Sequence, residues 1–154
     1  MAELRRKDRA IPEEEAKELL HRAEYGILST VSDDGQPYGV PLNFCIVENS
    51  IYFHCAIEGR LIENIKNNRS VSFCIVGNTE ILPDKFGMRY ESTIVSGNIE
   101  EVFDDQKQIG LEGFLVKYSS DFMEQGREYI EKLGERTRVF KMAICDISGK
   151  AKRE

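Results

Sequence analysis

The clearest alternation of apolar and polar positions in this chain covers residues 51–57, and a helical pattern follows it directly. Successive side chains of a strand point to opposite faces, so Phe53 would lie on an apolar face and His54 on the other. Beyond the alternation, apolar residues recur at helical spacing, which is typical of a helix with one buried face. The pattern therefore predicts a strand over 51–57, a turn at 58–60 and a helix over 59–67.

Similar patterns predict the other elements. Pro12 and the acidic residues after it suit the N-terminus of a helix. Further along, the patterns predict helices over 105–118 and 123–133 and strands over 25–31, 36–47, 70–76, 88–103 and 136–147. Gly97 is expected to form a bulge in the long strand, and Asp104 is expected to cap the helix that follows it. The residues of that helix expected to point inward are Ile109, Leu111, Leu115 and Tyr118.

Tight turns connect consecutive strands, which predicts an antiparallel arrangement. Asp34-Gly35 supplies the positive φ of a hairpin turn. Pro41 interrupts the next strand, and because proline cannot donate to a sheet it must lie at an edge or a bulge. About six strands with short helices between them predict a mainly β fold, in the form of a small closed or partly closed antiparallel barrel.

Composition narrows the class of protein. A length of 154 residues predicts a single domain over 1–154. The net charge of −6 and the pI of about 5.1 argue against nucleic acid or an anionic membrane as partner. The N-terminal sequence lacks the apolar region of a signal peptide and no apolar run reaches membrane-spanning length, so a cytoplasmic protein is expected. The four cysteines lack metal-ligand spacing and are expected to be reduced packing residues.

The turn at 58–60 is the first candidate for chemistry. Backbone N–H groups at a helix N-terminus favour negative charge, and Arg60 could add a two-pronged donor. The same residues also fit an ordinary strand–helix connection with a solvated arginine. Both interpretations stay open on the sequence of this turn.

His54 is the second candidate, because it lies mid-strand opposite the apolar face. It is either a histidine satisfied by a neighbouring hydroxyl group or a ring that lines a ligand cavity at the barrel mouth. His21 is expected on the surface, and the chain carries none of the phosphate-loop, dinucleotide, zinc-protease or serine-hydrolase motifs.

Several segments together resemble one family. In chain order they are RRKDRAI before a Pro-Glu helix start, YGILST, DGQPYGVPLNF, IYFHCAIEGRLIENI, YESTIVSG and a closing ISGK. Each is short, and their order along nearly the whole chain makes the match specific. The chain resembles the flavin-binding split-barrel superfamily of pyridoxamine 5'-phosphate oxidase-like proteins, and within it the nitroimidazole-resistance branch.

The resemblance implies a six-stranded antiparallel split barrel and a homodimer that binds FMN at two sites between its subunits. By position, it implies that the cofactor-binding residues are Val40, Pro41, Leu42, Asn43, His54, Glu58, Gly59, Arg60, Ser92 and Lys150. The first four would lie along the isoalloxazine ring, with their backbone at its polar edge. That place would explain the proline within a strand.

The resemblance also implies individual roles. His54 would be the catalytic residue beside the reacting substrate, and Arg60 would bind the phosphate. Ser92 would face the flavin, and Lys150 would lie near the site. Leu61 stands where relatives often carry a lysine, so one phosphate-binding cation is missing. The chain also lacks the arginine-rich C-terminus of true pyridoxamine-phosphate oxidases, so that reaction is not assigned.

Two functions follow. The first is an FMN-dependent oxidoreductase that reduces nitroimidazoles or other small oxidised compounds, in which His54 orients the substrate or transfers a proton. The second is a non-catalytic protein of the same fold that binds flavin or another small ligand. Fold and cofactor do not fix the chemistry, so the resemblance leaves both open.

Overall fold

The computed structural model describes residues 3–154, so the first two residues of the expected 1–154 domain lie outside the described part. Its α-helices are α1 (Glu13–Arg22), α2 (Arg60–Asn67), α3 (Asp104–Tyr118) and α4 (Met123–Leu133). Its strands are β1 (Ala10–Ile11), β2 (Gly26–Val31), β3 (Pro37–Leu42), β4 (Cys45–Val47), β5 (Ser50–Cys55), β6 (Ser70–Val76), β7 (Glu80–Leu82), β8 (Gly87–Val102), β9 (Arg138–Ala143) and β10 (Asp146–Lys152).

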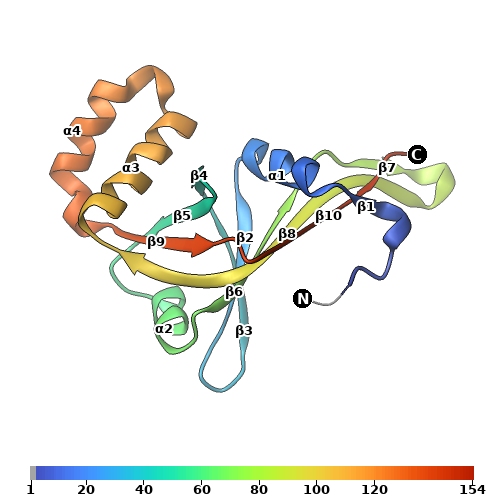
Figure 1. Ribbon diagram of the computed structural model, residues 1–154, viewed down its shortest axis with the longest axis horizontal. Helices are drawn as coiled ribbons and strands as arrows, with labels where there is room; N and C mark the ends of the chain where they lie inside the picture. The colour runs from blue at the N-terminus through green and yellow to red at the C-terminus, as the bar shows by residue number, and fades with distance from the viewer. Residues whose placement is uncertain (1–2) are drawn as a thin grey trace.

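The strands form one antiparallel sheet in the order β3-β2-β6-β8-β9-β5-β4. Strands β10 and β7 also pair with β8, and β1 pairs with β10. Figure 1 shows β8 crossing the molecule, with α3 and α4 at one end and α1 towards the other. The predicted mainly β fold is therefore confirmed, with helices at the periphery.

Strand β8 belongs to both halves of the sheet, and the change of partner occurs beside Gly97. Its N-terminal part pairs with β10 as far as Ser96 opposite Asp146, and its C-terminal part pairs with β9 from Ile99 opposite Met142. Gly97 and Asn98 of β8 thus face three residues, 143–145, of the segment that runs from β9 into β10. On its other edge β8 pairs with β6 in unbroken register through Gly97. The predicted bulge at Gly97 is therefore wrong, because the extra residue lies opposite it.

Two predicted strands are divided in the structure. Residues 36–47 form β3 and β4, which are separated at Asn43 and Phe44, and the last strand divides at 144–145 into β9 and β10. The first division lets the chain leave the edge beside β2 and pair with β5 instead. Strand β10 also continues to Lys152, beyond the predicted end at residue 147. The short strands β1 and β7 were not predicted.

Three phenylalanines mark the centre of the core. Phe44 and Phe53 each meet Phe73 edge to face, with ring centroids 4.8 and 5.0 Å apart. A second buried cluster lies under α3 and includes Tyr52, Val139 and Phe114. Both faces of β5 are therefore covered, because Phe53 enters the main core and Tyr52 enters the second cluster.

Helix α3 differs most from its predicted orientation. Gly110 and Phe114 are its buried residues, whereas Ile109 and Tyr118 are exposed. Its C-terminal end is fixed by the Tyr118 hydroxyl, which lies 2.6 Å from the Glu24 carbonyl oxygen and accepts the Phe44 N–H at 3.1 Å. Its N-cap is Phe103 and not Asp104, which has a φ of 52°. The predicted cap is therefore wrong by one residue.

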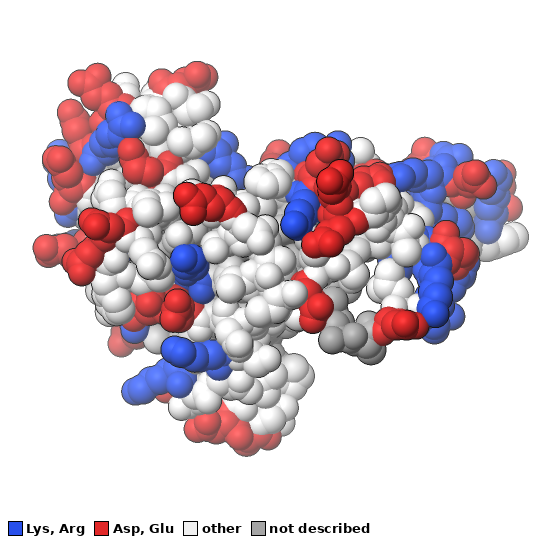
Figure 2. Space-filling view, viewed as in Figure 1, with Lys and Arg blue, Asp and Glu red and all other residues white. Residues whose placement is uncertain are grey.

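Charged side chains of both signs are interspersed on the face shown in Figure 2, which agrees with the modest net charge of −6. Within residues 3–154, no helix is long and apolar enough to cross a membrane.

We expect Gly97→Ala to lower the free energy of unfolding by about 1–3 kcal/mol, as overpacked sites do. A Cβ atom at Gly97 would lie 2.2 Å from the Ala143 carbonyl oxygen, which is backbone and cannot move aside alone. The matched control is Gly134→Ala, whose Cβ would meet its nearest neighbour at 3.6 Å. Urea unfolding of both variants measures the difference, and an equal effect of the two substitutions would contradict this assignment.

Candidate functional site

The turn between β5 and α2 has the backbone geometry of an anion-binding site. Gly59 has a φ of +143°, which L side chains rarely adopt, and a Cβ atom built there would have no neighbour within 4 Å. Helix α2 begins at Arg60, and the Glu63 N–H donates to the Gly59 carbonyl oxygen at 3.1 Å. The earlier N–H groups of the helix lack intrahelical partners and are available to a ligand. The open space around Gly59 leaves room for that ligand.

Helix α2 is held by a buried hydrogen bond. The Asn64 side chain is buried and donates from Nδ2 to Thr30 Oγ1 on β2 at 3.0 Å. Arg60, one turn earlier, lies over the Tyr38 ring of β3 with its guanidinium carbon 4.5 Å from the ring centroid. Its charge also helps to lower the pKa of Asp34, after the larger effect of the Ser32 hydrogen bond. Across the described residues Arg60 forms no ion pair within 4.0 Å, so its guanidinium remains available to an anion.

A second arginine positions the turn from the other side. Arg138 on β9 forms a two-pronged ion pair with Glu101 on β8, at 2.6 and 3.0 Å. Its remaining terminal nitrogen donates to the Ile57 carbonyl oxygen at 3.0 Å. This contact holds the chain just before Glu58 and Gly59, which line a cavity of about 530 Å³ with Arg138. Strand β5 has already ended at Cys55, so the predicted extension to Ile57 is wrong and that side chain is exposed.

Strand β3 supplies the second part of the candidate site. Val40 and Leu42 pack against the main core, whereas Pro41 is exposed on the other face. The strand pairs with β2 and is the first in the strand order, so its second edge is open as far as residues 3–154 are concerned. The prediction that Pro41 lies at an edge is therefore confirmed. An open edge of this kind exposes backbone donors and acceptors that a planar ligand can use.

His54 lies beside a cavity between β5 and the helices α3 and α4. Its ring meets Phe114 edge to face at 4.5 Å, and Asn43 lines the same cavity of about 270 Å³. Part of the ring stays exposed towards this space, while burial of the rest lowers the pKa of His54 below its ordinary value. Of the two interpretations of His54, the structure favours a ring that lines a cavity. At neutral pH such a ring offers one donor and one acceptor.

Ser92 and Lys150 lie together but several strands away from the candidates on β3. They are directly opposite each other on β8 and β10, and both are partly buried. In the strand order, β8 is three strands from β3 and β10 is paired beyond β8. At a strand spacing of ~4.8 Å, Ser92 is roughly 14 Å and Lys150 roughly 19 Å from β3. The candidates on β3 and the pair formed by Ser92 and Lys150 are therefore two groups that do not converge within one chain.

The two groups are joined by one uncovered face of the sheet. Pro41 lies opposite Ile27, which lies opposite Cys74, and Cys74 lies opposite Ile94. This row points away from the core, because the next row contains the fully buried residues Leu28, Phe73 and Val95. Ile27 keeps 38% of its surface exposed, and Tyr25 and Val76 near the same face each keep 60%. We call this surface the outer face.

The residues that sequence reasoning missed are those whose contacts are distant along the chain. Tyr38, Asn64 and Arg138 fix the turn at 58–60, and Phe114 covers His54. Arg138 is 81 positions from Ile57, so no local spacing connects them. Asn64 had one local signal, because it lies between Ile62 and Ile65, the buried apolar residues of the same helix.

Comparison with known proteins identifies the fold. The sequence matches the model of the family described as pyridoxamine 5'-phosphate oxidase over residues 12–151. No curated protein matches it significantly.

Three solved structures resemble the chain along nearly its whole length. A proposed 5-nitroimidazole antibiotic resistance protein from Bacteroides thetaiotaomicron has 22% identity and a TM-score of 0.76, over 92% of this chain and 86% of that one. A conserved hypothetical protein from Mycobacterium tuberculosis has 14% identity and a TM-score of 0.82, over 98% and 91%. An FAD-binding protein from Mesorhizobium loti has 23% identity and a TM-score of 0.65, over 94% and 97%. At these identities the likeness establishes the split-barrel fold.

We expect the stability of the protein to depend on pH through His54. Its pKa is lowered in the folded state, so between that value and the ordinary pKa of about 6.5 the unfolded chain binds more protons. The stability that depends on neutral His54 is therefore fully present above pH ~6.5. The free energy of unfolding decreases as the pH falls towards the folded pKa. His54→Gln should remove this part of the pH dependence and cost little stability at pH 7, because the ring is not in the core. Denaturant unfolding at a series of pH values measures it, and identical pH profiles would contradict the assignment.

Proposed function

The chain belongs to the pyridoxamine 5'-phosphate oxidase family, and from this membership we propose that it is an FMN-binding oxidoreductase that works as a homodimer. We propose further that it belongs to the nitroimidazole-resistance branch and reduces nitroimidazoles or other small oxidised compounds. Flavin binding is typical of the fold, and the choice of FMN, the dimer and the reaction are our proposals.

The observation that carries the proposal is the start of α2. Gly59 has a backbone conformation that favours glycine, the first N–H groups of α2 are free, and Arg60 has no carboxylate partner within the described chain. Together these features fit a phosphate group at this turn. Leu61, where relatives often carry a lysine, packs against the main core. The position therefore has a packing role here, and we assign the phosphate to Arg60, the cation of the turn itself.

The open edge of β3 and the cavity beside His54 suit the ring and the substrate. Pro41 leaves this edge without one backbone donor, and the backbone of 40–43 would meet the polar edge of the flavin. Bound FMN would supply the electron transfer. We assign to His54 the positioning of a substrate and the holding of a proton, because its neutral ring can donate and accept at physiological pH.

The separation of Ser92 and Lys150 from β3 supports the dimer. One chain keeps these two groups roughly 14–19 Å apart, whereas two chains that meet at their outer faces could bring Ser92 of one beside β3 of the other. The exposed side chains of Ile27 and Val76 give this face the apolar character of an interface. The flavin would then be bound by residues of both subunits.

A protein that binds flavin without turnover remains the second candidate, because every feature above concerns binding except His54. The absorbance spectrum of the purified protein tests the shared part, since bound flavin gives visible bands. Steady oxidation of a reduced nicotinamide in the presence of a nitro compound would support the enzyme. Bound flavin without such turnover, with several nitro compounds and donors, would support the binding protein.

We expect Arg60→Ala to weaken FMN binding by about tenfold to a hundredfold, because a charge-assisted hydrogen bond contributes about 1.5–3 kcal/mol. Riboflavin lacks the phosphate and should bind wild type and variant about equally. Lys132→Ala is the control, because it removes a cation from the last turn of α4, away from this turn. Titrations followed by flavin fluorescence compare the ligands, and equal losses for FMN and riboflavin would remove Arg60 from the phosphate site.

We expect Ile27→Arg to convert the dimer to a monomer and to release flavin. The charge would lie in the middle of the outer face, where a stable interface should bury well over about 1,000 Å² in total. Phe122→Arg changes a side chain that is 60% exposed near the junction of α3 and α4, and it should leave the dimer intact. Sedimentation velocity with flavin absorbance reads both properties, and a wild-type protein that stays monomeric with flavin bound would refute the shared site.

A further inference from the structure

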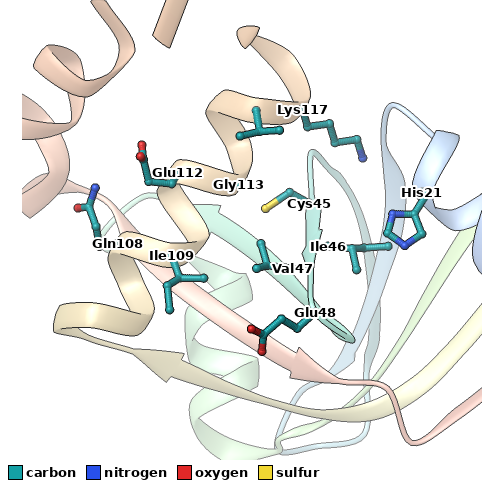
Figure 3. Close-up of a pocket in the computed structure, with 11 residues that line it drawn as sticks. His21, Cys45, Ile46, Val47, Glu48, Gln108, Ile109, Glu112, Gly113 and Lys117 are labelled. Atoms are coloured by element: carbon teal, nitrogen blue, oxygen red, sulfur yellow. The ribbon is translucent and has the colours of Figure 1, made fainter. Parts of the chain in front are cut away.

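A second cavity lies on the other side of α3 from His54. It is bounded by β4, by α3 and by His21 at the C-terminal end of α1, and its volume is about 640 Å³ (Figure 3). None of the residues that line it also lines the cavity beside His54. We call it the α3 cleft. Because the two spaces are separate, an inference about the α3 cleft does not rest on the proposed flavin function.

The walls of the α3 cleft are largely aliphatic. Cys45 and Val47 form its floor, and Ile109 and Val116 project from α3 with 44% and 63% of their surface exposed. Gly113 lets the helix lie close to the floor, because a Cβ atom there would be 2.8 Å from both Cys45 Sγ and Val47 Cγ2. Exposed aliphatic side chains around a cavity favour an apolar ligand.

Lys117 places a cation at one end of this apolar space. Its ammonium group donates to the Phe44 carbonyl oxygen at 2.9 Å and lies 3.5 Å from the centroid of the Phe44 ring. Between residues 3 and 154, no carboxylate lies within 4.0 Å of it. An ammonium group has three N–H donors, so two remain for a ligand. Figure 3 shows Lys117 and His21 extending towards the same side of the cleft.

The acidic groups of the cleft do not neutralise this cation. Glu112 is paired with Arg127, whose Nε donates to its carboxylate at 3.0 Å. Glu48 follows the end of β4, and Figure 3 shows it far from Lys117. Burial lowers the pKa of Lys117 to about 8, and the charge of Glu24, which lies beyond ion-pair distance, offsets only part of this effect. An anionic ligand group would supply the missing counter-charge.

We propose that the α3 cleft binds a small monocarboxylic acid with an aliphatic body. Its carboxylate accepts hydrogen bonds from Lys117, and its alkyl chain lies along Val47, Ile109 and Val116 with its far end towards Glu48. The charge at one end and the absence of aromatic walls along the floor select an acid with a flexible chain. The acidic Glu48 at the far end disfavours a second carboxylate, so a dicarboxylic acid should bind more weakly than a monocarboxylic acid.

Decanoate and its neutral amide, decanamide, test the proposal on the full-length protein. Calorimetric titration should show decanoate binding about tenfold to a hundredfold more tightly than decanamide, the range expected for hydrogen bonds to an ion. Amide shifts in NMR spectra should map both ligands to Val47, Ile109 and Val116. Equal affinity for the two ligands, shifts elsewhere or no saturable binding of decanoate would overturn the proposal.

Substitutions at two positions test whether the charge of Lys117 causes the preference for decanoate. Lys117→Met should abolish the preference for decanoate, although it also removes the bond to Phe44 and so affects the fold. Val116→Glu avoids that problem, because Val116 is exposed and adjacent to Lys117 in sequence. Both Val116→Glu and the matched Val116→Gln remove an apolar contact to the alkyl chain, so each should weaken decanamide by a similar factor. Only Val116→Glu should also repel the carboxylate, so it should weaken decanoate more than Val116→Gln does. Decanoate binding that survives both Lys117→Met and Val116→Glu would overturn the proposal.

The affinity for decanoate should fall above about pH 8, where free Lys117 loses its proton. The groups facing Lys117 are the Cys45 thiol, the Tyr118 hydroxyl, Glu24 and His21. Burial raises the pKa of Cys45 to about 12 and also raises the pKa of Tyr118, so neither ionises in this range. His21→Gln should leave the midpoint unchanged. An affinity that stays constant to pH 10 would show that Lys117 does not bind the carboxylate.

Discussion

The pairing of β8 on both edges is the constraint on which the rest of the structure depends. One strand carries β6 without interruption on one edge and exchanges β10 for β9 on the other, at a point where a glycine allows the Ala143 carbonyl to approach. Because of this exchange, the sheet has two halves that diverge and can enclose a core. The extra residue at 143–145 lets the polypeptide pass from β9 in one half of the sheet to β10 in the other. A side chain at Gly97 would push these halves apart.

The candidate site is built at the ends of elements that this sheet fixes. Glu101 and Arg138 are paired from β8 and β9, and Arg138 in turn holds the Ile57 carbonyl before the turn of Gly59. The buried bond between Asn64 and Thr30 sets the angle of α2. The Asn64–Thr30 bond is buried, so leaving either group unpaired would be costly, whereas the Arg138–Ile57 contact is exposed. The start of α2 is therefore contacted from two directions, which favours the preorganisation that anion binding by backbone N–H groups requires.

The sequence was sufficient for what depends on local patterns. Alternation located the cores of β2, β5, β6 and β8, and the positive φ expected at the Asp34-Gly35 turn is present at Gly35. Local patterns failed where partners far along the chain decide. The division at Phe44 follows from β5 being available to β4, which no local signal announces. In α3, apolar residues lie on all sides, so periodicity could not tell that Phe114 is buried and Ile109 exposed.

For the candidate site, too, local sequence patterns could not show which residues lie together. The resemblance named Ser92, Lys150 and the β3 residues as one site, yet the strand order of a single chain keeps them several strands apart. A sequence pattern gives no sign of which residues meet across two copies, because the spacing between them is not a property of one chain. If both groups contact the same flavin, then binding and association are thermodynamically linked. Each then stabilises the other by mass action, and flavin affinity depends on protein concentration. In that case, dilution would release the cofactor without any change in the residues that contact it.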